Sequence, residues 1–404
     1  MYWYLLQTIF LFTVGNNLLQ ARTEPDELLS PQSISYEGVT GYTDQDTDPC
    51  LEWGHTTEGT KIPVSLNPPS GLRIRWLGTA GYEISDDSVT ILIDPFVSRP
   101  KPYELFRELD IDTEAVDYYI LEPLQVNQLQ LILISHNHYD HVLDLPYILS
   151  RFPDPETRPL VVGDPNVAEL LHSFTDTVSI SWLRVSGGLE NTRIVVADFY
   201  TKEPTGVTNH SKYVGHFGDF EIWAYSSLHP AYHPLPWRGP EGQTETSPPF
   251  TALGYKTYHN ISIEYLISYK GLRIYFSETP ITLYPKAVEH AHIVLQGIAA
   301  RKNEHTIPQT LAYLKPQYLI PAHYDNFFKP LQEFQQFDYH IGLPYAEEVI
   351  DFSRWEEFLV EFPTFLKEAQ GLNPQATSDN PTQIRVLKLF YYYSLESLIP
   401  QKKE

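Results

Sequence analysis

Residues 129–134 (LQLILI) and residues 135–141 (SHNHYDH), which follow directly, are the stretch that decides the fold. The first segment is almost continuously apolar, which predicts a strand covered on both faces. The second segment holds His136, His138, Asp140 and His141, and such a density of imidazoles and carboxylate is rare in an ordinary surface loop. A loop at the end of a buried strand is held in place by the sheet. The sequence therefore predicts a buried sheet whose edge carries a metal-binding loop.

Further apolar runs surround this stretch and indicate many strands mixed with helices. Helices are expected from about 165 to 171, from 308 to 314, and from 353 to 368 with an interruption at Pro363. This mixture predicts two packed sheets covered by helices. Strands are expected at residues 72–77, 82–85, 89–93, 160–162, 220–225, 261–269, 272–276, 292–295 and 318–320.

Three later strands are each followed by another metal-ligand type of side chain. His229 follows the strand at 220–225, Glu278 follows 272–276, and His323 follows 318–320. His233 competes with His229 for the same role. Imidazole and carboxylate ligands suit Zn, Mn or Fe, so these donors are expected to meet the SHNHYDH loop at one rim.

Taken together, these motifs resemble the metallo-β-lactamase-fold hydrolase superfamily over roughly residues 71–345. The resemblance rests on residues 76–81 (WLGTAG), the turn at 93–95 (IDP), the HxHxDH motif, His229, the turn at 277–279 (SET) and residues 319–324 (LIPAHY). Within the superfamily, the chain is most similar to the branch of L-ascorbate-6-phosphate lactonase-like proteins and N-acyl-phosphatidylethanolamine phospholipase D. The fold class that this implies is α/β (α+β), a four-layer αββα sandwich of two mixed β-sheets flanked by helices.

The resemblance also implies two divalent metal ions, expected to be Zn, with Mn or Fe as alternatives. Glu278 departs from the family, which has an aspartate at this turn as the bridge between the metals; glutamate is one methylene longer and can bridge both ions or reach only one. The implied ligands are His136, His138 and His229 for one ion, and Asp140, His141 and His323 for the other.

The predicted activity is hydrolysis by a metal-activated water. Asp140 is expected to orient or deprotonate this water, and His305 is a candidate proton donor or substrate contact. The expected substrate is a small-molecule or lipid-like phosphodiester or related ester. Alternatives are a lactone hydrolase and a non-catalytic metal-binding protein with a degenerate second site. Flavodiiron-type redox chemistry is disfavoured because it normally needs Glu at position 138, and nothing favours glyoxalase-like or persulfide dioxygenase chemistry.

The net charge of the chain argues against one class of binding partner. The 404 residues carry a formal net charge of −23, which argues against general binding to nucleic acid. The 14% aromatic content is typical of a folded chain, and the lone Cys50 excludes an intramolecular disulfide. The sequence leaves the oligomeric state open.

The N-terminus carries an apolar stretch at residues 2–14, which makes about 20 Å of helix and is short for a membrane span. We interpret residues 1–21 as a signal peptide or N-terminal anchor, although a basic start is missing. This predicts a periplasmic, secreted or membrane-anchored protein, or a cytoplasmic one if the segment is no signal. The expected organisation continues with a leader at 22–70, the main domain at 71–345, and a C-terminal helical extension and tail at 346–404.

Overall fold

The computed structural model describes most of the chain from residue 68 onward. The predicted signal segment at 1–21 lies outside the described residues, as does the predicted leader up to residue 67. None of the helices in the described ranges is long and apolar enough to cross a membrane. The described residues are 68–124, 126–175, 188–197, 211–229, 241–242, 248, 250–278, 288, 290–298, 306–325, 331, 355–373, 382–385, 387 and 389–400.

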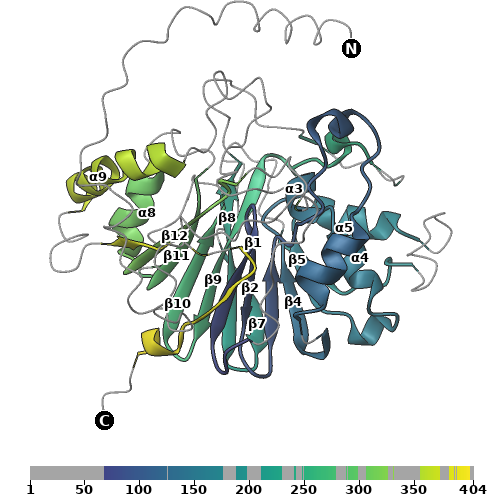
Figure 1. Cartoon of the computed structure of the whole chain (residues 1–404), viewed down its shortest axis with the longest axis horizontal. Coiled ribbons are helices and arrows are strands. Elements are labelled where there is room, and N and C mark those ends of the chain that lie inside the picture. Colours follow the sequence, from purple (N-terminus) through teal and green to yellow (C-terminus); the bar gives the residue numbers. More distant parts are fainter. Residues whose placement is uncertain are drawn as a thin grey trace, which may run out of the picture.

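Two seven-stranded sheets lie at the centre of the molecule (Figure 1). In the first sheet, the order is β14-β1-β2-β3-β4-β5-β6. Antiparallel pairing joins β14, β1, β2 and β3, and parallel pairing joins β3 to β6. Its strands are β1 (Arg73–Gly78), β2 (Gly81–Ser85), β3 (Thr90–Ile93), β4 (Leu129–Leu133), β5 (Leu160–Gly163), β6 (Ile194–Val196) and β14 (Tyr392–Ser394).

The second sheet is also mixed, with the order β13-β12-β11-β10-β9-β8-β7. Strands β7 to β10 pair antiparallel, and β10 to β13 pair parallel. Its strands are β7 (Ser211–Phe217), β8 (Phe220–Leu228), β9 (Ile261–Tyr269), β10 (Leu272–Ser277), β11 (Ile293–Gly297), β12 (Tyr318–Ala322) and β13 (Gln383–Ile384).

The main core lies between the two sheets. On β9, Ile263, Tyr265 and Ile267 belong to this core, whereas Leu266 packs in a separate small cluster on the opposite face. This is the alternation expected of a strand that is buried on both faces. The Tyr265 hydroxyl donates a hydrogen bond of 2.6 Å to the carbonyl of Ile134, just after β4 of the other sheet. The two sheets therefore face each other directly.

Helices form the outer layers, with α4 and α5 on one side of the sheets and α8 and α9 on the other (Figure 1). The predicted αββα sandwich is confirmed. The helices are α2 (Thr113–Val116), α3 (Tyr139–Val142), α4 (Leu145–Ser150), α5 (Pro165–Ser173), α8 (Thr306–Leu314) and α9 (Trp355–Leu372). Shorter helical turns are η3 (Pro102–Phe106), η4 (Asp117–Leu121), η5 (Val126–Gln128), η6 (Pro155–Thr157), η7 (Ala252–Gly254) and η9 (Glu396–Leu398).

Helix α9 differs from the sequence prediction because it continues through Pro363. Proline removes one backbone donor and crowds the preceding turn. Here, however, Phe358, Phe362 and Ala369 on either side of the proline are buried in the main core. This burial on both sides of the proline keeps the helix in one piece, so the predicted interruption was wrong.

The C-terminal residues complete both sheets. Strand β13 pairs with β12, and β14 pairs with β1. Residues that the sequence assigned to a helical extension and tail therefore supply an edge strand to each sheet, in addition to the expected helix.

Candidate metal centre

The loop after β4 presents four of the predicted donors. His136 and His138 lie in the connection between β4 and α3, and Asp140 and His141 lie in the short helix α3 itself. All four side chains are buried, with residue exposures between 1% and 7%. The strand places this loop at one edge of the first sheet, so its donors are fixed by a rigid support.

The other three predicted donors come from the second sheet. His229 follows β8, Glu278 follows β10, and His323 follows β12. These three strands run in the same direction, because β8 and β10 are both antiparallel to β9, and β10 to β12 pair parallel. Their carboxyl ends therefore lie at the same edge of the sheet.

The structure brings all seven of these side chains together. Three groups have ligand atoms that all lie within 4.8 Å of one another. The groups are His136, His138 and His229; His136, His141 and Glu278; and Asp140, His141 and His323. The first and second groups share His136, and the second and third share His141, so the three groups form one continuous centre.

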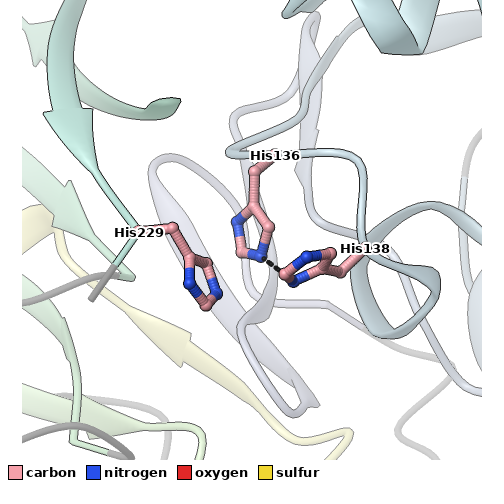
Figure 2. Close-up of side chains that lie close together, drawn as sticks. All are labelled: His136, His138 and His229. Atoms are coloured by element: carbon pink, nitrogen blue, oxygen red, sulfur yellow. Dashed lines mark hydrogen bonds between the residues drawn. The ribbon is translucent and has the colours of Figure 1, made fainter. Parts of the chain in front are cut away.

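The first group consists of three imidazoles that surround a common point (Figure 2). The Nε2 atom of His136 lies 3.1 Å from Nδ1 of His138. The His229 ring lies 4.7 Å from the His136 ring and 4.6 Å from the His138 ring, centroid to centroid. Ligand nitrogens about 3.3 Å apart are expected around a tetrahedral ion with bonds of about 2.0–2.1 Å. The pair formed by His136 and His138 has this spacing.

The third group combines a carboxylate with two imidazoles. Oδ2 of Asp140 lies 3.3 Å from Nε2 of His323 and 3.6 Å from Nε2 of His141. Burial by itself would raise the pKa of Asp140, but His141 and His323 lower the pKa well below its usual range. Asp140 is therefore ionised at neutral pH and available as an oxygen ligand.

Glu278 lies between the first and third groups. Its Oε2 atom is 3.7 Å from Nδ1 of His136, and its Oε1 atom is 3.7 Å from Nε2 of His323. Burial raises the pKa of Glu278, and the cationic forms of His141 and His323 oppose this rise. Its two oxygens therefore lie near two different histidines, and the His136 atom near Glu278 is Nδ1, whereas Nε2 of the same ring faces His138.

Two side chains behind the donors were missed as support residues in the sequence analysis. Asp94 lies at the end of β3, and its Oδ2 atom is 2.9 Å from Nδ1 of His141. Asp94 also accepts hydrogen bonds from the backbone N–H and the hydroxyl of Ser135, at 2.7 and 2.6 Å. Because β3 pairs parallel with β4, an acid at the end of one strand is close to the loop that follows the other. The sequence feature that could have identified Asp94 as a support residue was the Asp-Pro turn directly after β3.

The surroundings of His136 and His141 shift the pKa values of these two side chains in opposite directions. Burial lowers the pKa of His136 well below its usual value, and the neighbouring imidazoles His141 and His138 lower it further. Burial would also lower the pKa of His141, but Asp140 and Asp94 raise it to about 9. His136 is therefore a neutral ligand at pH 7, whereas His141 holds a proton that a metal ion must displace.

The donor set is suited to binding divalent metal ions. Metal-ligand chemistry requires neutral imidazoles and ionised carboxylates that are close together and removed from water. The three groups supply buried imidazoles and carboxylates at close range, and His141 would lose its proton when a metal ion binds. The Oε2 atom of Glu278 is also buried without a hydrogen-bond donor among the residues that the structure describes. A buried carboxylate oxygen of this kind is costly unless a cation or another donor satisfies it. His305 and His233 lie outside the described residues, so the structure does not place either of them.

Parts of this chain are similar in sequence to a known protein family and to curated metal-dependent hydrolases. Residues 74–240 match the sequence model of the metallo-beta-lactamase superfamily, and this segment includes the HxHxDH motif and His229. The chain is 36% identical over 81 residues to a UPF0173 metal-dependent hydrolase of Methanopyrus kandleri, which is 20% of this chain and 27% of that protein. It is 25% identical over 154 residues to a UPF0173 protein of Pyrococcus furiosus, which is 37% of this chain and 60% of that protein.

The matches thus span 27% and 60% of the length of these curated relatives. Among solved structures, the chain is similar to Igni18, a metallo hydrolase from Ignicoccus hospitalis. The identity is 12%, the TM-score is 0.42, and the match covers 80% of this chain and 97% of that one. Residues 74–240 of this chain thus match the sequence model of the metallo-beta-lactamase superfamily, and the described residues form two mixed seven-stranded sheets flanked by helices.

Proposed function

We propose that this protein is a metal-dependent hydrolase that uses two divalent cations, with zinc as the expected metal. The observation that carries the proposal is the chain of three overlapping donor groups, joined through His136 and His141. A single structural ion needs one closed set of about four ligands. Seven buried donors arranged in overlapping groups are more than one ion requires.

The side chains have distinct tasks in this proposal. His136, His138 and His229 hold the first cation, and Asp140, His141 and His323 hold the second. Glu278 holds its two oxygens toward both. Divalent cations bound there supply Lewis-acid catalysis and lower the pKa of a water molecule toward neutrality. Asp140, which is ionised and belongs to the third donor group, would orient this water or accept its proton.

The proposed substrate is a phosphodiester or a related ester. Two adjacent cations suit displacement at phosphorus, because one side of the centre can stabilise the attacking oxygen and the other the leaving oxygen. The motif order supports the same class, since it resembles the branch with N-acyl-phosphatidylethanolamine phospholipase D. That branch also holds lactonase-like proteins, so lactone hydrolysis is the second candidate of the same chemistry.

The rival proposal is a non-catalytic protein with one bound ion and a degenerate second site. Its only support is the presence of Glu278 where the family has aspartate. Glu278 nevertheless belongs to the second donor group and also lies 3.7 Å from His323 of the third, which favours the two-cation proposal.

The test is an activity screen of the full chain loaded with Zn²⁺, using bis(p-nitrophenyl) phosphate and a panel of lactones. The proposal expects phosphodiester hydrolysis that is lost after chelation and returns when Zn²⁺ is added. Hydrolysis of lactones without hydrolysis of the phosphodiester would identify lactone hydrolysis, the second candidate, as the activity. Metal binding without turnover of any ester would support the non-catalytic rival.

A further inference from the structure

The last donor, His323, has an unusual backbone conformation. Its φ angle is 59°, in the left-handed region that residues with a side chain rarely adopt. Thr79 and Arg99 are also in this region, with φ angles of 48° and 39°. Such conformations persist only where the surrounding structure enforces them, and they gather at functional sites. The contacts among these three residues show what enforces the conformation of His323.

Two hydrogen bonds tie the segment that holds His323 and Asp325 to the turn between β1 and β2. The His323 N–H donates to the Thr79 carbonyl at 2.8 Å, and the Thr79 N–H donates to Oδ1 of Asp325 at 2.9 Å. The indole N–H of Trp76 donates to the same Thr79 carbonyl at 3.2 Å, and the Trp76 ring stacks on Tyr324. The segment after β12 is thereby joined to the other sheet.

A buried ion pair completes this connection. Arg99 pairs with Oδ2 of Asp325, and the two side chains are 0% and 1% exposed. Gly78 leaves room for the pair, since a Cβ at this position would clash with the Arg99 guanidinium. Asp325 therefore uses one oxygen to hold Thr79 and the other to hold Arg99. Because Thr79 in turn holds His323, the charge pair acts on the donor through the backbone.

The conformation of His323 determines where its imidazole lies. Its Nε2 atom is 3.3 Å from Oδ2 of Asp140 and 3.7 Å from Oε1 of Glu278. Asp140 comes from α3, so the third donor group closes only if His323 extends from β12 toward it. A change of φ to the ordinary region would turn the side chain away from this point.

We propose that Arg99 and Asp325 are positioning residues for the second cation, because they hold His323 in the left-handed conformation that closes its donor group. This inference rests on the proposed two-cation function. It goes beyond that function by assigning a role to two residues that belong to none of the three donor groups. Loss of the pair is expected to weaken the second cation and leave the first one bound.

The experiment compares two buried arginines, Arg75 on β1 and Arg99 in the segment that follows β3. Arg75 pairs with Glu83, and these side chains are 0% and 3% exposed, but none of the contacts described for this pair is to a donor. Arg99→Met and Arg75→Met therefore break equally buried ion pairs. Each full-length variant is stripped with a chelator and titrated with Zn²⁺ against a chromophoric chelator, which gives the Kd of each equivalent.

For Arg99→Met, the second Kd is expected to rise by about 10- to 100-fold, with the first Kd changed by less than about threefold. For Arg75→Met, both are expected to stay within about threefold of wild type. Wild-type loading of Arg99→Met, equal weakening of both equivalents, or the same selective loss in Arg75→Met would overturn the proposal.

Arg99→Lys is the second variant to test in case Arg99→Met does not fold. Lysine keeps the positive charge but lacks the planar guanidinium. This variant is judged by the same criterion, with a smaller selective rise in the second Kd expected. Wild type is titrated alongside the variants. A missing second equivalent in wild type would count against the proposed function, whereas wild-type loading of the variants would count against the positioning role.

Discussion

The first and third donor groups differ in charge although they share one centre. The first group is made of imidazoles alone, and burial keeps His136 neutral. The third group contains Asp140, and its His141 holds a proton between two acids. The first group can accept a cation without losing a proton from His136, whereas the third must release one from His141. If this centre holds two ions as proposed, their affinities are expected to differ, and so is the dependence of each affinity on pH.

The largest effect is expected from replacing His136, which the first and second donor groups share. His136 belongs to the first and second groups, so His136→Ala is expected to remove the first ion and to disturb the position of Glu278. We predict a loss of phosphodiester hydrolysis of roughly 1,000-fold, since metal ions contribute several kcal/mol of transition-state stabilisation. Elemental analysis and turnover of the purified variant provide the measurement. The control is His216→Ala, an exposed position on β7, which should behave as wild type.

A smaller change tests the link through Glu278. Gly297 at the end of β11 leaves no space for a Cβ, which would clash with the Glu278 carbonyl oxygen. Gly297→Ala is therefore expected to displace Glu278 and reduce kcat/KM by about 10- to 100-fold. Kinetic assays with matched metal loading check this result. Gly371→Ala in α9 meets no neighbouring atom and should keep full activity, and an equal loss in both variants would contradict the account.

The protonation of His141 predicts how pH affects the metal-stripped protein. Its pKa is raised in the folded state from 6.5 to about 9, so its contribution to stability is fully present below pH 6.5. This contribution is lost as the pH rises through about 9. We expect the Tm of chelator-treated protein to fall by a few degrees between pH 6.5 and 9. In Asp94→Asn, the fall should be smaller, because one of the acids that raise this pKa is neutral. A Tm that rises with pH in stripped wild type would refute the prediction.

The mildest substitution is Glu278→Asp, which restores the acid that is usual in the family. If Glu278 bridges, the shorter carboxylate is expected to keep both ions and to preserve or raise activity. The isosteric Glu278→Gln lacks the charge and should lose the second ion at Zn²⁺ concentrations that saturate wild type. Equilibrium dialysis with elemental analysis distinguishes the two variants. Loss of an ion from Glu278→Asp would show instead that the loop is built for the longer acid.

Much of the fold could be predicted because apolar runs mark the buried strands directly. The strand at residues 129–134 and the later strands all form close to their expected bounds. Strands β6, β13 and β14 were missed because they are only two or three residues long, and β7 was missed because it is largely exposed. The continuous α9 was missed because a proline rule is local, whereas burial of Phe358 and Phe362 depends on the tertiary fold.

The donors were predictable for a different reason than their supports. Each donor directly follows an apolar strand, so sequence position alone suggests a shared edge. The contact of Asp94 with His141 and the pairing of Arg99 with Asp325 join segments that are far apart in the chain. Such contacts depend on which strands are neighbours and on the backbone angles of single residues. The Asp-Pro turn marked Asp94 in the sequence but did not reveal its partner.

The central claim is that one edge of the sandwich holds two cations, and counting them tests it most directly. The measurement is the zinc content of the purified full-length chain after dialysis against Zn²⁺ and removal of free ions. The account predicts two equivalents in wild type and one in His323→Ala, whose change leaves His136, His138 and His229 in place. One equivalent or fewer in wild type, or an unchanged content in His323→Ala, would contradict it.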